Sequence, residues 1–295
     1  MKRKRIHVFA LTAVLALGTL GLAGCGAAGE TETPDGDGAA AELSGEITVE
    51  GSDTMVNLGQ AFAEAFMEEN PEVMIAVKGG GTGTGLAALI NGTVDFANAS
   101  RDMKDEERAQ IEAGGGTVYE TAVAVDGIAV VVHPDNPVTE ISMADLGRIY
   151  RGEITNWSEL GGPDREIVVL SRDTASGTYE FFLETVVAAE DENAEMTPAA
   201  QMLGSTQAIV SEVTGNEGAI GYVGLGYLTD QIQVVAVDGV AASVETARDG
   251  SYPISRNLYM YAAKTPEGVM AAYLEWILGE AGQAIVVDQG FVPLD

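Results

Sequence analysis

Residues 46–85 read EITVEGSDTMVNLGQAFAEAFMEENPEVMIAVKGGGTGTG, and their pattern decides the fold. A short strand, Glu46–Glu50, runs into a polar loop, and apolar residues at helical spacing follow over Met55–Glu69. Asn70-Pro71 ends that helix, and a second strand over Val73–Val77 leads into a glycine-rich loop. A strand–loop–helix–strand unit of this kind predicts an α/β fold with mainly parallel strands.

The same order of elements continues along the rest of the chain. The polar loops fall where strands end and helices begin, which is where open α/β sheets bind ligands. Further strands are expected over Val94–Ala99, Val118–Val132 (with a break at Asp126-Gly127), Ile167–Leu170, Ala219–Val223 and Ile232–Val237. Further helices are expected over Leu86–Ile90, Asp105–Ala113, Ser142–Tyr150 and Tyr179–Ala189, with a last helix over Pro266–Leu278.

The N-terminus has the layout of a secretory signal. Basic residues fill positions 2–5, an apolar stretch covers Val8–Ala23, and Cys25 follows. Leu22-Ala23-Gly24-Cys25 resembles a bacterial lipobox, which implies a signal peptide over residues 1–24 and a lipid on Cys25. The alternative is an ordinary cleaved signal with an incidental cysteine. Because Cys25 is the only cysteine, the chain forms no intramolecular disulfide.

After the signal, residues 25–44 are mostly small and polar, which predicts a flexible acidic linker. Removing residues 1–24 takes four of the 15 basic residues and leaves 11 against 45 acidic ones, a net charge of −34. Nucleic acid is therefore a poor partner. An anionic ligand would be repelled at long range, so an anion site needs short-range hydrogen bonds in a sheltered cleft.

Three loops place hydroxyls and glycines at the start of a predicted helix. They are Gly51-Ser52-Asp53-Thr54, Gly81-Thr82-Gly83-Thr84-Gly85 and Ser176-Gly177-Thr178. Helix N-termini bind anions through free backbone N–H groups, and hydroxyls add donors. Taken singly, Ser52, Thr54, Thr84 and Ser176 could be ordinary helix caps. Taken together, the three loops predict an anion site.

The scarce basic residues also stand near strand ends, as Lys78, Arg101 and Arg172 do. Arg172 is the strongest candidate, because a planar guanidinium binds a tetrahedral oxyanion with two parallel hydrogen bonds. The alternative is a surface arginine paired with Asp173.

These motifs together resemble the phosphate-binding proteins of Pst-type ABC transporters, over about residues 46–295. The most specific match is Arg-Asp-x-x-Ser-Gly-Thr at Arg172–Thr178. The other matching stretches are Gly51–Met55, Gly79–Gly85, Val94–Arg101, Ile149–Trp157 and Gly218–Tyr222.

The resemblance implies a two-lobed periplasmic-binding-protein type II fold, with phosphate in the cleft between the lobes. The first lobe would comprise residues 45–131 and 256–295, and the second lobe residues 132–255. The implied ligands are Ser52, Asp53, Thr54, Thr82, Ser100 and Arg101 from the first lobe, and Arg172, Ser176, Gly177 and Thr178 from the second. Some family members have an aspartate where this chain has Ser100-Arg101. Asp53 is then the candidate acceptor for the phosphate proton, unless it only caps the following helix.

The resemblance also implies the partners. The ligand would be inorganic phosphate, passed to the membrane permease subunits of an ABC importer by a monomer anchored through Cys25 on the outer face of the cell membrane. No cofactor or metal is expected. The alternatives are another tetrahedral oxyanion (sulfate, molybdate or tungstate), or a phosphate sensor or adhesin with the same cleft.

An enzyme is the main competing class, and the residues argue against it. His7 lies in the signal, which leaves only His133, and no Gly-x-Ser-x-Gly motif is present. The spacing of a zinc site is missing as well. The run Gly83–Ala88 fits Gly-x-Gly-x-x-Ala, but Ser100-Arg101 stand where a dinucleotide site needs an acidic residue.

Overall fold

The computed structural model describes residues 43–294. The predicted signal peptide, the predicted lipid site Cys25 and nearly all of the predicted linker lie outside the described residues. Among the helices of residues 43–294, none combines the length and the apolar character that crossing a membrane requires.

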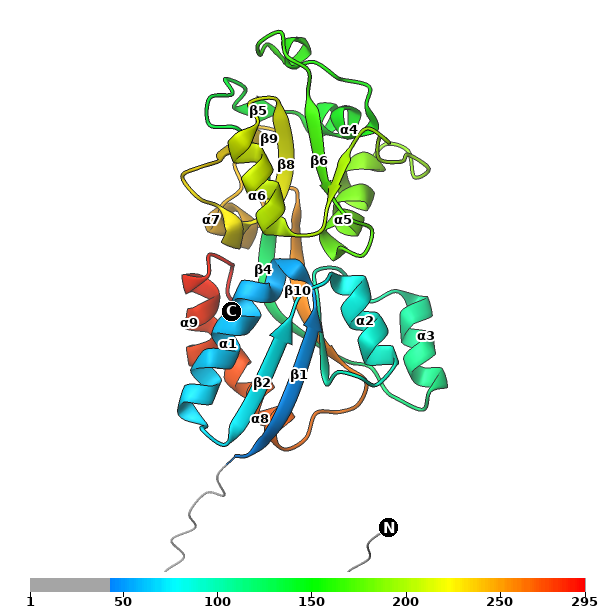
Figure 1. Cartoon of the computed structure of the whole chain (residues 1–295), viewed down its shortest axis with the longest axis vertical. Helices are drawn as coiled ribbons and strands as arrows, with labels where there is room; N and C mark the ends of the chain where they lie inside the picture. The colour runs from blue at the N-terminus through cyan, green and yellow to red at the C-terminus, as the bar shows by residue number, and fades with distance from the viewer. Residues whose placement is uncertain (1–42, 295) are drawn as a thin grey trace, which may run out of the picture. The chain divides into compact units, whose positions relative to one another are not determined.

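Helices and strands alternate along the described chain (Figure 1). The strands are β1 (Gly45–Gly51), β2 (Val73–Lys78), β3 (Phe96–Ala99), β4 (Tyr119–Val132), β5 (Glu140–Ile141), β6 (Val168–Arg172), β7 (Gln201–Leu203), β8 (Ala219–Gly224), β9 (Gln233–Val237) and β10 (Ser255–Ala262). The α-helices are α1 (Val56–Glu69), α2 (Thr82–Ile90), α3 (Asp105–Ala113), α4 (Met143–Arg151), α5 (Gly177–Phe182), α6 (Thr206–Gly215), α7 (Val244–Arg248), α8 (Val269–Leu278) and α9 (Glu280–Asp288). Short helical turns are η1 (Asp53–Met55), η2 (Trp157–Leu160), η3 (Leu183–Val187) and η4 (Leu225–Tyr227).

The strands form one mixed sheet in the order β2-β1-β3-β10-β4-β8-β6-β7, and β9 pairs with both β4 and β5. β1 is parallel to β2 and β3, and β6 is parallel to β7 and β8. β10 is antiparallel to β3 and β4, and β4 is antiparallel to β8 and β9. The predicted α/β class is therefore confirmed, and the sheet is mixed because β4 and β10 run against their neighbours.

Strand β4 runs without interruption through Asp126-Gly127, so the predicted break there is wrong. What changes at this point is the pairing. β4 pairs with β10 as far as Gly127 and with β8 from Ile128 onward. In Figure 1, β4 and β10 accordingly run between the lower and the upper groups of elements.

The buried apolar residues divide between two regions of the sheet. What we call the first core lies around β1–β3 and β10, and its residues fall between 47 and 124 and between 258 and 291. The second core lies around β6, β8 and β9 and draws on residues 128–254 together with Val292.

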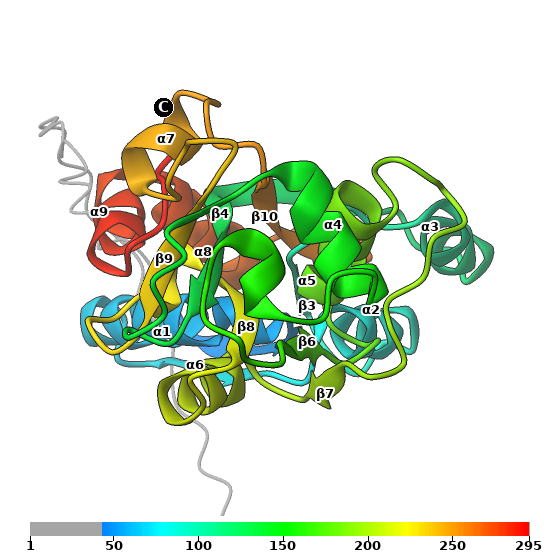
Figure 2. The same cartoon turned by 90° about the horizontal axis from the view of Figure 1, so that it is seen from above.

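Successive side chains of a strand point to opposite faces of the sheet, so the first core has two faces. Phe96 and Met260 pack with α1, α8 and α9, whereas their neighbours Ala97 and Tyr261 pack with α2 and α3. Figures 1 and 2 show these two sets of helices on opposite sides of the strands. The loops that follow β1 and β3 lie at the end of the first core nearest β6 and α5.

Candidate anion-binding site

The loops predicted to bind an anion come from distant parts of the chain and meet between the two cores. Asp53 lies between β1 and α1, Thr82 begins α2, and Ser100 follows β3. Because β1 and β3 are parallel neighbours, their carboxyl ends lie at the same edge of the sheet. Six predicted hydroxyl side chains are buried here: Ser52, Thr54, Thr82, Ser100, Ser176 and Thr178.

Hydrogen bonds join the hydroxyls of the first core into one cluster. Ser52 Oγ donates to Ser100 Oγ at 2.8 Å, and the backbone N–H of Ser100 donates to Thr82 Oγ1 at 3.1 Å. Gly177 of α5 packs directly against this cluster. A Cβ at Gly177 would lie 2.9 Å from Ser100 Oγ and would clash with Thr82, so only glycine permits this approach.

Two further contacts join the loop after β1 and the start of α2 to the start of α5. Thr54 Oγ1 lies 2.7 Å from Thr178 Oγ1, and the N–H of Gly83 donates to the carbonyl of Ala175 at 3.0 Å. Ser176 is an N-cap, because its Oγ accepts the N–H of Thr178 at 3.2 Å. Elements of the two cores therefore touch directly through these loops.

Arg172, at the end of β6, is buried with 1% of its surface exposed. Its Nε donates to the carbonyl of Leu203 at 3.2 Å, Nη1 to Thr206 Oγ1 at 2.7 Å, and Nη2 to the carbonyl of Gly204 at 3.1 Å. A guanidinium has five N–H groups, so these three bonds fix the orientation of the fork and leave one hydrogen on each Nη. The alternative of a surface arginine is wrong.

Asp53 is the carboxylate next to Arg172. Its Oδ2 lies 3.6 Å from Arg172 Nη2 and accepts the N–H of Thr206, the first residue of α6, at 2.7 Å. The hydroxyl of Tyr227 donates to the carbonyl of Asp53 at 2.9 Å. Asp53 therefore caps a helix that belongs to the second core, which was not foreseen. A contact between Asp53 and phosphate stays a prediction.

Arg101 directs its guanidinium to two carboxylates. Its Nη atoms donate to both oxygens of Glu107 at 2.8 Å, and its Nε is paired with Glu180 of α5, which also pairs with Lys104. Burial lowers the pKa of Arg101, but the bonds and charges of Glu107 and Glu180 outweigh burial, so the pKa is raised. The other nine predicted residues lie together. Arg101 lies beside them, but its guanidinium is already paired with Glu107 and Glu180. A contact between Arg101 and phosphate stays a prediction.

Sequence reasoning missed three buried residues that border the site, namely Thr206, Asp126 and Arg256. Thr206 binds both Arg172 and Asp53, as described above. Arg256 of β10 donates to Asp126 of β4 and to Thr178. Arg256 was missed because it stands inside a strand, away from any glycine or hydroxyl loop. The one available signal was the scarcity of basic residues in this chain.

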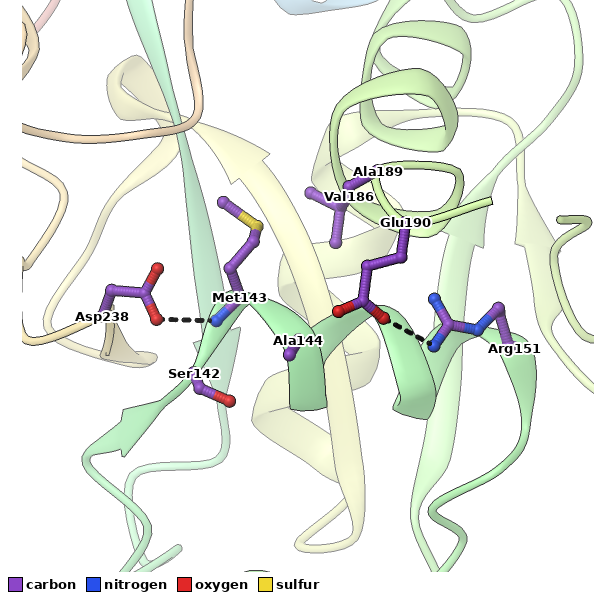
Figure 3. A pocket seen from close by; sticks show the side chains of 8 residues that line it. All are labelled: Ser142, Met143, Ala144, Arg151, Val186, Ala189, Glu190 and Asp238. Atoms are coloured by element: carbon purple, nitrogen blue, oxygen red, sulfur yellow. Dashed lines mark hydrogen bonds and ion pairs between the residues drawn. The ribbon is translucent and has the colours of Figure 1, made fainter. Parts of the chain in front are cut away.

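A separate hollow of about 280 Å³ lies at the start of α4 (Figure 3). Its polar groups are already paired: Asp238 Oδ1 accepts the N–H of Met143 at 2.9 Å, and Arg151 lies 3.6 Å from Glu190. No predicted site residue lines it. Within residues 43–294, no cluster of histidine, cysteine and carboxylate side chains is suited to a metal ion.

Comparisons with known proteins agree on one family. The model of the PBP superfamily domain matches residues 36–281. The phosphate-binding protein PstS of Bacillus subtilis is 36% identical over 276 residues, which cover 92% of this chain and 89% of that protein. PstS of Pseudomonas aeruginosa is 32% identical over 317 residues, which cover 100% of this chain and 96% of that protein.

A solved structure gives the same result. The substrate-binding protein of a putative phosphate ABC transporter from Clostridium perfringens, with bound phosphate, superposes with a TM-score of 0.79 at 35% identity. The superposition covers 85% of this chain and 100% of that one. The periplasmic-binding-protein fold that the sequence motifs implied is therefore confirmed.

Proposed function

The chain belongs to the PBP superfamily and, within it, to the family of the phosphate-binding protein PstS, and from this membership we propose that it captures inorganic phosphate for an ABC importer. The observation that carries the proposal is the buried Arg172, which lies with the half-buried Asp53 beside hydroxyls from four separate loops. Such a site offers many donors to an oxyanion, which suits a protein whose net charge repels anions at long range.

Each group in the site has a part in binding. Arg172 donates from its fixed fork to two phosphate oxygens. The hydroxyls of Thr54, Thr82, Ser100, Ser176 and Thr178, with the backbone N–H of Gly177, donate to the rest, and Ser52 joins them when its hydroxyl turns from Ser100 to the anion. The Asp53 carboxylate accepts a hydrogen bond from the P–OH group that phosphate carries near neutral pH. Arg101 adds positive charge at the rim of the site, where Glu107 and Glu180 hold it.

Capture involves closure of two lobes, residues 45–131 with 256–295 and residues 132–255, about the strands β4 and β10. The Thr54–Thr178 and Gly83–Ala175 contacts belong to the closed form, because they join elements of the two cores. Closure excludes water and so strengthens each hydrogen bond to the anion.

The proposal includes export and anchoring. Residues 1–24 direct secretion, Cys25 carries lipid, residues 25–44 form the tether, and the monomer meets permease subunits at the outer face of the membrane. Replacement of Cys25 by alanine tests the anchor. The variant is expected in the soluble fraction or as unprocessed precursor, and normally processed variant in washed membranes would overturn anchoring by lipid.

The protein acts by binding and not by catalysis, in keeping with relatives that are named as binding proteins. Calorimetric titration tests the ligand. Purified protein is titrated with phosphate, sulfate and molybdate in the same buffer at pH 7. A heat of binding with phosphate, and none with sulfate or molybdate, supports the proposal. Tighter binding of sulfate or molybdate than of phosphate would mean that phosphate is not the ligand.

A further inference from the structure

Arg256 is a buried arginine that touches both sides of the site. Its side chain is 3% exposed and stands opposite Asp126 in the register of β10 and β4. Nη1 donates to the carbonyl of Ser100 at 2.6 Å, and Nη2 donates to Asp126 Oδ2 at 3.1 Å and to Thr178 Oγ1 at 2.9 Å. One guanidinium thus connects the loop after β3, the start of α5 and a strand that serves both cores.

The Asp126–Arg256 pair is difficult to explain by stability. Asp126 is fully buried, and its second oxygen accepts the N–H of Leu225 at 3.0 Å. Burial raises the pKa of Asp126 and lowers that of Arg256, so the surroundings oppose both charges. A buried ion pair commonly adds no more stability than well-packed apolar residues of the same size. A pair in this position therefore calls for another explanation.

The direction of the hydrogen bonds supplies one. A guanidinium can only donate, so Thr178 Oγ1 must accept from Arg256. A hydroxyl has a single proton, which must then point away from Arg256. The neighbours left on that side are Thr54 Oγ1 at 2.7 Å and any anion in the site. Arg256 therefore leaves the Thr178 proton for Thr54 or for an oxyanion, and an oxyanion is the stronger acceptor of the two.

We infer that Arg256 is a positioning residue for the oxyanion. It holds the Thr178 hydroxyl with its proton toward the ligand and ties the Ser100 loop to the same point. Asp126 keeps the Arg256 fork in place. The inference rests on the proposed function, because it assumes that phosphate binds beside Thr178.

A double-mutant cycle tests this inference. Phosphate affinity is measured by calorimetry for the wild type, Arg256→Lys, Thr178→Val and the double variant. Lysine keeps a positive charge beside Asp126, but a single ammonium cannot reach Ser100 and Thr178 as the fork does. Each single variant is expected to bind phosphate about tenfold more weakly, which is the loss of about one hydrogen bond to a charged group.

The double variant decides the question. If Arg256 acts through Thr178, the double variant binds within about twofold of the weaker single variant. A merely structural role predicts that the two losses multiply, or that Arg256→Lys lowers the melting temperature at unchanged affinity. Either of those results overturns the inference. Arg165→Lys is the matched control, since Arg165 is exposed and paired with Glu217, and its affinity is expected to equal that of the wild type.

A variant with two substitutions covers the case in which Arg256→Lys does not fold. It combines Arg256→Gln with Asp126→Asn, which removes both buried charges together and leaves neither charge unpaired. The same cycle with Thr178→Val is then measured, with the same expected result. If the wild type binds no phosphate, the proposed function is refuted. If the wild type binds phosphate but the losses of affinity in the two single variants multiply in the double variant, only the role of Arg256 is refuted.

Discussion

Leu203, Gly204 and Thr206 accept three of the N–H groups of Arg172, which fixes the orientation of its guanidinium. Arg172→Lys is expected to lower phosphate affinity at least about tenfold, since hydrogen bonds to charged groups contribute about 1.5–3 kcal/mol each. The ammonium keeps the charge but cannot reproduce the planar fork. Calorimetry measures the affinity, and circular dichroism checks that the variant is folded. Wild-type affinity in Arg172→Lys would mean that the guanidinium lies outside the ligand contacts.

Asp53 bears on the choice between phosphate and sulfate. A fixed carboxylate accepts a hydrogen bond from protonated phosphate, but sulfate at neutral pH has no proton and meets a like charge. In Asp53→Asn the side-chain oxygen can still accept the N–H of Thr206, so the cap on α6 survives. Phosphate binding is expected to weaken modestly, and sulfate is expected to compete in a displacement titration. Unchanged exclusion of sulfate would falsify the role of Asp53 as proton acceptor.

Residues differ in how far the sequence reveals them. The meeting of the loops that carry Ser52, Thr82 and Thr178 could be predicted, because glycine and hydroxyl loops at strand ends are a local signal. The partner of Asp53 could not be predicted. Its contact with Thr206 spans 153 positions and exists only once both cores have formed. Arg256 lacked a local signal for the same reason.

At the scale of elements, α5 carries the acidic half of an ionic contact between the two cores. We call Glu180 of α5 with Arg101 and Lys104 the Glu180 clasp. Under the proposed closure, these ion pairs form only in the closed protein. Glu180→Gln is expected to speed phosphate release about two- to fivefold, because partly exposed pairs contribute up to about 1 kcal/mol. Stopped-flow displacement of bound phosphate measures the release rate.

Glu184→Gln is the control for the clasp, because Glu184 is an exposed glutamate four residues further along the same helical segment. It is expected to release phosphate at the wild-type rate. Salt supplies a second check. Release from the wild type is expected to quicken with added NaCl more than release from Glu180→Gln, which has no clasp left to screen. Equal release rates in Glu180→Gln and the wild type would show that the clasp does not hold the closed form.

Elements with a clear period were predicted well, and elements defined by tertiary pairing were not. Asp105–Ala113 matches α3 at both ends, because an acidic first turn and a following glycine mark its limits. The strand β10 was missed, since Arg256 and Asn257 interrupt its apolar run, and their setting becomes clear only opposite β4. The helix predicted as the last one ends at Leu278 as α8 does, but α9 follows it after Gly279.

Charge acts at the scale of the whole molecule, and it opposes the function proposed for the site. After removal of residues 1–24, the chain carries a net charge of −34, and phosphate near neutral pH is itself an anion. A cleft lined by charge of the opposite sign attracts a charged ligand at long range. Under the proposed function, the attraction begins here only at the distances of the hydrogen bonds around Arg172. Phosphate therefore has to approach against the long-range repulsion of the net charge. The short-range hydrogen bonds of the site then stabilise the complex.

This division predicts how salt affects the rate of capture. Added NaCl shortens the screening length from about 10 Å at 0.1 M to about 3 Å at 1 M, so the repulsion outside the cleft fades. The association rate constant for phosphate is expected to rise with ionic strength, the reverse of electrostatic steering. Stopped-flow mixing at several NaCl concentrations measures it, with Glu180→Gln alongside to separate the effect of the clasp on release. An association rate that falls with salt would mean that a local positive potential, centred on Arg101, Lys104 and Arg172, outweighs the net charge at the mouth of the site.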